Sequence, residues 1–179
     1  MKTTTTLVIC IMLTLTLSIP EGFCGDVSAL QFYYLVKQVF PETQKVTVLI
    51  TKSDLEKQLK KIERASIQCK VKTEIFDVEN SIEIGKAFKR IKPNEILIIF
   101  DNELFLNKKN KMYIMSKSKE KQILIVTSSK DYVNSGALLG YITEDGKKKI
   151  VVNLKLSTNL KDKFTDELIQ KVGIKKVIM

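Results

Sequence analysis

The sequence predicts an α/β protein, with a single domain built on one layered, mostly parallel, Rossmann-like sheet and helices on both faces. Strand-like runs alternate with helix-like segments along the chain, as they do in proteins built from βαβ units. Two of these runs, EILIIF at Glu95–Phe100 and QILIV at Gln122–Val126, are apolar almost throughout, which is typical of strands buried on both faces of a parallel sheet. A hairpin pattern near the C-terminus adds antiparallel strands at one edge.

The first half of the chain alternates between helix and strand. A broad apolar face predicts a first helix that ends at Pro41, and a β-branched run predicts the strand after it. Ser53 and Asp54 are candidate caps of the next, amphipathic helix, and Asn80 or Ser81 caps a third one. The expected elements span Ser28–Phe40, Lys45–Thr51, Leu55–Ala65, Cys69–Val78 and 81–91.

The second half holds the two apolar strands and the closing elements. Between the strands, residues 101–116 have scattered apolar positions that predict a helix broken by a loop at Asn107–Lys111. After the second strand, a helix is expected over Thr165–Val172, followed by a short apolar tail at Lys175–Ile178.

A β-hairpin is expected between the second apolar strand and the closing helix. Two apolar runs, Ala137–Ile142 and Ile150–Leu154, flank the pair Asp145-Gly146. Asp-Gly adopts the positive φ angles of a type I′ turn, which is the preferred connection of a tight hairpin. An exposed edge strand in this hairpin would allow a homodimer to form by pairing with a second copy of the chain, although Lys147–Lys149 would oppose such pairing.

The N-terminus has the pattern of a secretory signal peptide. Lys2 is followed by the apolar stretch Leu7–Leu17 and by small residues near Gly25 that suit cleavage. The stretch is shorter than the roughly 20 residues that a membrane-spanning helix needs. We therefore expect residues 1–25 to be removed and residues 26–179 to form one periplasmic or secreted domain. An uncleaved membrane anchor is the alternative.

The three cysteines do not predict a disulfide framework. Cys10 lies in the leader, and Cys24 lies at its end, where the bulky Phe23 before it disfavours a lipoprotein site. After cleavage Cys69 has no partner within the chain, so it is either a buried thiol or an intermolecular link.

Composition excludes several classes of function. The formal net charge is +10, but the lysines are scattered without interleaved aromatic residues, so we expect solvated lysine faces and no nucleic-acid binding. The chain contains no histidine, which excludes Ser-His-Asp and Cys-His catalysis and histidine-bound zinc. Its glycines form neither a phosphate-binding loop nor a dinucleotide motif. We therefore expect no catalytic residues, metal or cofactor, and a protein that is not an enzyme.

Short polar residues follow the predicted parallel strands. Ligands of open α/β sheets bind outside the carboxyl ends of the strands, so these residues are candidate ligand-binding residues, although ordinary helix caps have the same composition. The candidates are Thr51, Ser53, Asp101, Asn102, Thr127, Ser128 and Ser129.

Several segments together resemble the YfiR-like family of exported regulatory proteins. They are FYYLVKQVFPE at Phe32–Glu42, the strands VTVLIT and EILIIF, and the C-terminal segment SGALLGYITEDGKKKIVVNL with DELIQKV after it. The resemblance implies a periplasmic regulator that binds a membrane sensor such as a diguanylate cyclase or a histidine kinase. The family's stabilising cysteine pairs are missing here, because Glu95 precedes EILIIF and Cys69 stands alone.

The closing segment is also similar to that of exported substrate-binding proteins of ABC transporters of the tryptophan/tyrosine type. Those proteins have two lobes, whereas this chain has room for one, which favours the regulator. A small-molecule-binding protein is the alternative function. For the regulator, we expect a partner surface on the aromatic first helix, formed by Phe32, Tyr33 and Phe40.

Overall fold

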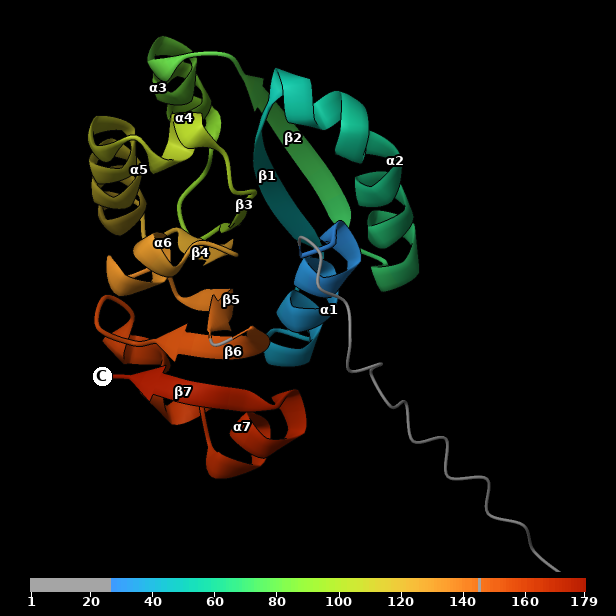
Figure 1. Ribbon diagram of the computed structural model, residues 1–179. Coiled ribbons are helices and arrows are strands. Elements are labelled where there is room, and N and C mark those ends of the chain that lie inside the picture. Colours follow the sequence, from blue (N-terminus) through green and yellow to red (C-terminus); the bar gives the residue numbers. More distant parts are fainter. Residues whose placement is uncertain (1–26, 145) are drawn as a thin grey trace, which may run out of the picture.

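The computed structural model describes residues 27–144 and 146–179. The expected signal peptide, with Cys10 and Cys24, lies outside these residues. In this part of the chain, seven strands form one sheet in the order β2-β1-β3-β4-β5-β6-β7, and Figure 1 shows helices on both of its sides. This arrangement confirms the predicted α/β fold class.

The strands are β1 (Lys45–Thr51), β2 (Lys72–Val78), β3 (Ile96–Ile99), β4 (Leu124–Thr127), β5 (Leu139–Glu144), β6 (Lys147–Asn153) and β7 (Ile174–Ile178). The helices are α1 (Ala29–Val39), α2 (Lys52–Cys69), α3 (Ser81–Arg90), α4 (Glu103–Leu106), α5 (Lys108–Glu120), α6 (Lys130–Asn134) and α7 (Asp166–Val172), with a 3₁₀ helix, η1 (Thr158–Lys163), before α7.

The first five strands of the sheet are parallel, and β5 and β6 form the predicted antiparallel hairpin. Gly146, in the turn, has a φ of +71°, which favours glycine there. The strand β6 begins at Lys147, so the lysines after the turn belong to the hairpin. The C-terminal segment expected as a tail forms β7, which pairs in parallel with β6. The hairpin therefore lies one strand in from this edge of the sheet.

Three element boundaries differ from the sequence prediction. Cys69 belongs to the end of α2, not to the strand after it, because α2 continues until Lys70 adopts a left-handed conformation. The break between α4 and α5 is the single residue Asn107, which ends one helix and caps the next. The short helix α6 was not predicted, and Ser129 caps it.

Two apolar layers flank the sheet. Because alternate residues of a strand point to opposite faces, Val48 of β1 packs into the layer that includes α1 and α2, whereas Leu49 packs into the layer that includes α3 and α5. Figure 1 shows α1, α2 and α7 on one side of the sheet and α3 to α6 on the other. The core strands are thus covered on both faces, as their continuous apolar sequences predict.

The aromatic residues of α1 belong to the core. Phe32 and Tyr33 are fully buried and Phe40 is 5% exposed. These three side chains therefore do not form the exposed partner surface that was expected from the sequence. The reason is that α2 and α7 pack beside α1 and cover its broad apolar face. The ring of Phe32 meets those of Phe100 and Tyr141 edge to face, with the centroids 5.4 and 6.2 Å away.

Cys69 is a buried thiol in this fold. Its residue is 7% exposed, and burial raises the pKa of the thiol. Of the two interpretations left open by the sequence, the buried thiol fits this position. In the described ranges, no helix is long and apolar enough to cross a membrane.

Polar side chains join β1 to β3 at their amino ends. The Glu95 carboxylate accepts hydrogen bonds from Lys45 Nζ at 2.8 Å and from Thr47 Oγ1 at 2.7 Å. Burial alone would raise the pKa of Glu95, but the hydrogen bonds from Lys45 and Thr47 outweigh it and lower that pKa. Glu95 thus occupies the position before the strand as an ionised group held by β1.

We expect Phe32→Ala to destabilise the fold by about 3–5 kcal/mol, because it removes a fully buried ring that contacts two other aromatic side chains. The matched control is Tyr34→Ala on the same helix, whose side chain is 51% exposed and whose loss should change stability by at most about 0.5 kcal/mol. Urea unfolding followed by circular dichroism measures both. Equal effects of the two substitutions would contradict the burial of the α1 aromatic face.

Glu144 provides a second test, on the hairpin. Its carboxylate pairs with Lys130 of α6 at 3.0 Å and with Lys149 of β6 at 3.1 Å, and these hydrogen bonds lower the pKa of Glu144 to about 2. We expect Lys130→Gln to raise that pKa toward its ordinary value, and Lys171→Gln to leave it unchanged. Carboxyl NMR titration measures the shift. Because the folded pKa is lowered, the stabilisation by this group is present above the ordinary carboxyl pKa and is lost as the pH falls toward 2.

Candidate functional site

The strand order reverses its direction at β1. The chain passes from β1 to β2 on one side of β1, and then returns to place β3 on the other side. The connections that leave the carboxyl ends of β1 and β3 therefore diverge to opposite faces of the sheet. In open α/β sheets such a switch point is where a crevice opens and where ligands bind.

Three polar side chains meet at this switch point. The Asp54 carboxylate accepts a hydrogen bond from Thr51 Oγ1 at 2.7 Å and another from Asn102 Nδ2 at 2.6 Å, both on Oδ2. Thr51 is the N-cap of α2 and Asn102 is the N-cap of α4, so each residue also fixes the start of its helix. The cluster therefore joins the ends of β1 and β3 through side chains.

An open cleft of about 490 Å³, here called the switch-point cleft, lies beside this cluster and is lined by two of its members, Thr51 and Asn102. Its lining comes from the carboxyl ends of three neighbouring strands and from the helices that follow them. The residues are Thr51, Lys52, Ser53, Glu56, Val78, Glu79, Asn102 and Leu104. Lys52 and Glu79 form an ion pair across the cleft with Nζ and Oε1 2.9 Å apart, and both side chains are more than half exposed.

The cleft offers groups for both signs of charge. The first N–H groups of α2, an 18-residue helix, and the ammonium of Lys52 favour an anionic group. The carboxylates of Glu56 and Glu79 favour a cationic group. No cluster of three His, Cys, Asp or Glu residues that could hold a metal ion occurs among residues 27–144 and 146–179. The arrangement suits a small ligand with a separated ammonium and carboxylate.

The structure brings three of the seven sequence-predicted site residues to this cleft, namely Thr51, Ser53 and Asn102. Asp101 directly precedes Asn102 but is not among the residues that line the cleft. Asp101 acts instead on Tyr132, whose pKa is raised by burial and, to a smaller extent, by this nearby carboxylate.

The other three predicted residues lie at the carboxyl end of β4, two strands away from β1 in the sheet. Thr127 Oγ1 accepts a hydrogen bond from the N–H of Ser129, and Ser129 Oγ accepts one from the N–H of Tyr132. Both residues are buried, whereas Ser128 between them is half-buried. Ser129 thus caps α6, Thr127 holds the backbone just before it, and the three residues do not line the switch-point cleft.

Sequence reasoning missed the acidic members of the site, which are Asp54, Glu56 and Glu79. Asp54 was interpreted only as a helix cap. The sequence signal that could have identified Asp54 is its spacing from Thr51 after a buried strand, which is a capping-box pattern. The contact between Asp54 and Asn102 joins residues 48 positions apart, so it depends on the sheet register.

No family model and no curated protein matches this chain. Solved structures do match its fold. The ABC domain in complex with L-Trp from Streptococcus pneumoniae has a TM-score of 0.65 at 13% identity, with 84% of this chain and 60% of that chain covered. A conserved domain protein from Vibrio cholerae O1 biovar El Tor has a TM-score of 0.70 at 11% identity, with coverages of 86% and 61%.

A third match is a substrate-binding protein with adhesive properties from Clostridium difficile, in its ligand-free, open form. It has a TM-score of 0.60 at 14% identity, with 85% of this chain and 58% of that chain covered. This chain therefore spans about three fifths of the length of the three proteins. At these identities the likeness establishes the fold, which is shared with substrate-binding proteins. The comparisons give no support to the YfiR-like resemblance.

The hydrogen-bonded cluster can be tested by Asn102→Asp. This substitution keeps the Oδ1 atom that caps α4, but it replaces the donor to Asp54 with a second carboxylate. We expect a loss of about 1–3 kcal/mol of stability at pH 7. The loss should shrink as the pH falls toward 4, because protonation of either carboxylate removes their repulsion.

Denaturant unfolding at pH 7 and at pH 4 measures this effect. The control is Asn107→Asp, which changes another helix-capping asparagine at the start of the lysine-rich helix α5. It should alter stability by at most about 0.5 kcal/mol at both pH values. The same small, pH-independent effect for Asn102→Asp would show that the cluster does not hold the two strands together.

Proposed function

We propose that the protein binds a small zwitterion, such as an amino acid, in the switch-point cleft, and that it is a binding protein rather than an enzyme. The observation that carries the proposal is the cleft itself. It lies at the reversal of strand order, and the Thr51–Asp54–Asn102 cluster forms part of its framework.

The fold comparisons support ligand binding over regulation of a membrane sensor. One neighbour was solved in complex with L-Trp, and another is a substrate-binding protein. Both support the alternative function expected from the sequence. The signal-peptide pattern adds that binding takes place outside the cytoplasm.

The proposed ligand pose follows from the charges around the cleft. The ligand carboxylate lies at the amino end of α2, within reach of Lys52, and the ligand ammonium lies between Glu56 and Glu79. The ion pair between Lys52 and Glu79 is exposed, and such pairs are worth at most about 1 kcal/mol, so a ligand can replace it at little cost. Val78 and Leu104 supply the apolar contacts for the ligand's side chain.

We expect a thermal-shift screen of the twenty amino acids to identify at least one that stabilises the protein. Isothermal titration of the best ligand should then show that both charges are needed. The N-acetyl derivative loses the ammonium and the primary amide loses the carboxylate, and each should bind about tenfold or more weakly, because a charged hydrogen bond is lost.

Matched variants locate the site. We expect Glu56→Gln to weaken binding about tenfold, whereas Glu63→Gln, on the same helix but outside the cleft, leaves the dissociation constant unchanged. Two results count against the proposal. One is a flat response to all twenty amino acids, and the other is an equal effect of the two glutamate substitutions.

A further inference from the structure

The sheet opens at the amino end of β4. On one side β4 pairs with β3 along its whole length, from Ile96↔Leu124 to Ile99↔Thr127. On the other side it pairs with β5 only through Val126↔Leu139 and Thr127↔Gly140. Leu124 and Ile125 therefore have no register partner on β5, because the chain before Leu139 turns away from β4.

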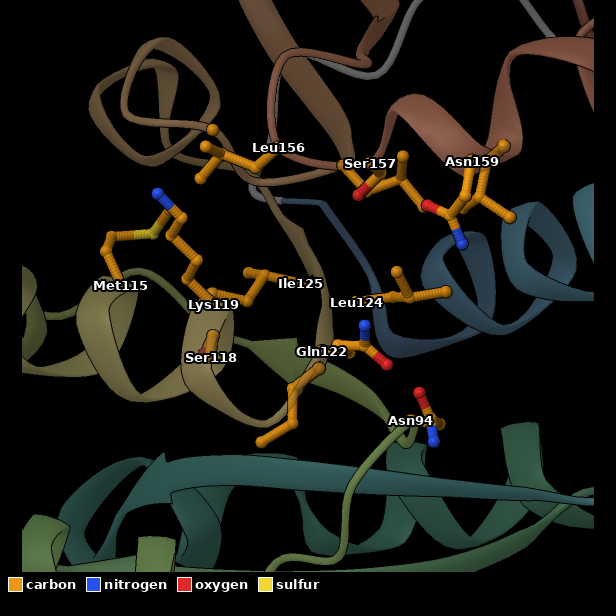
Figure 2. A pocket seen from close by; sticks show the side chains of 14 residues that line it. Asn94, Met115, Ser118, Lys119, Gln122, Leu124, Ile125, Leu156, Ser157 and Asn159 are labelled. Carbon is orange, nitrogen blue, oxygen red and sulfur yellow. The ribbon is translucent and has the colours of Figure 1, made fainter.

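A second cleft, of about 460 Å³, fills this opening, and we call it the amino-edge cleft. It lies at the opposite end of the parallel strands from the switch-point cleft. Figure 2 shows Leu156, Ser157 and Asn159 on one side, with Ser118, Gln122 and Asn94 across from them. Its volume is in the range of small-molecule sites.

The walls of this cleft are mainly apolar. Met115 of α5 lines one side, Leu124 and Ile125 of β4 lie between the sides, and Leu156 lines the other. Leu160 is also a lining residue. A mainly apolar wall with a few polar groups is the usual composition of a site that binds an organic molecule.

One serine hydroxyl in the wall lacks the partner that a buried hydroxyl normally has. Ser118 is 3% exposed, and its Oγ has no hydrogen-bond partner within the described residues. A buried hydroxyl left unpaired is unfavourable, so such a group in a cleft wall points to a partner that binds there.

The charge of this cleft differs from that of the switch-point cleft. Among the described residues that line it, none is acidic and Lys119 is the one with a charge. The side-chain amides of Asn94, Gln122 and Asn159 also line the cleft and present N–H donors to an oxygen-rich group. Figure 2 shows them apart from the Lys119 side chain, which extends toward Met115 and Leu156. The polar part of the wall therefore favours an anionic head, while the apolar part favours a hydrocarbon body.

We propose that the amino-edge cleft binds a small amphipathic carboxylate, with its hydrocarbon body against Leu124, Ile125 and Leu156 and its head group at Lys119. The Ser118 hydroxyl is a positioning group that hydrogen-bonds the head group or its bound water. This site is separate from the switch-point cleft and does not depend on the proposed function.

Three probes with one hydrocarbon chain and different head groups test the proposal, namely octanoate, octanamide and octylammonium. In a ¹H–¹⁵N NMR titration of the protein, octanoate should shift the amide signals of residues 118–125 and 156–160 in a saturable way. Octanamide should bind about fivefold more weakly than octanoate, because only the charge is lost, and octylammonium should cause no saturable shift. Equal responses to octanoate and octylammonium, or no saturable shift with octanoate, would overturn the proposal.

Two substitutions separate a ligand role from a structural one. Lys119→Gln should weaken octanoate binding about fivefold, and Lys109→Gln, on the same helix but outside the cleft, should leave it unchanged. Ser118→Ala should weaken octanoate binding while the melting temperature stays the same or rises, because an unpaired hydroxyl is removed. A lower melting temperature with unchanged octanoate affinity would show that Ser118 is only structural and would remove this support.

Discussion

β1 and β3 are hydrogen-bonded neighbours in the sheet, although β2 and its flanking helices separate them in sequence. Side-chain hydrogen bonds hold this pair of strands together at both ends. At the amino end, the Glu95 carboxylate accepts hydrogen bonds from Lys45 and Thr47. At the carboxyl end, the Asp54 carboxylate accepts one from Asn102. The reversal of strand order requires this pairing, because β1 must be flanked on both sides before the sheet can extend toward β4. The position of the switch-point cleft follows directly from it.

The two clefts arise from different features of the same sheet. The first opens because the connections after β1 and β3 leave to opposite faces, and it carries both acidic and basic groups. The second opens because β5 pairs with only half of β4, and Lys119 lines it together with apolar residues and amides. One sheet therefore presents, at the opposite ends of its parallel strands, surfaces that suit ligands of different chemistry.

The sequence predicted the elements whose signals are local. The buried strands β3 and β4, the hairpin around Gly146 and the cap of α3 at Asn80 all formed where their patterns indicated. The strand β7 was not recognised, because the run IKKVI is short and joins the sheet only through its pairing with β6. The burial of α1 was misjudged, because helical spacing reveals an apolar face but does not reveal that α2 and α7 cover it.

The candidate site was predictable in part for the same reason. Residues at the carboxyl end of a strand can be found from the strand itself, and Thr51, Ser53 and Asn102 were found in this way. Asp54 and Glu79 acquire their place in the site only when β1, β2 and β3 become neighbours. The amino-edge cleft left no signal in the sequence, since it depends on where β5 stops pairing with β4.

Hydrogen–deuterium exchange of the protein, with and without the amino acid that stabilises it most, tests most directly whether the switch point is the ligand site. The account predicts added protection at residues 51–56, 78–80 and 101–104, at the ends of the three strands that surround the switch-point cleft. Added protection confined to β5–β7, or to the amino-edge cleft, would contradict it.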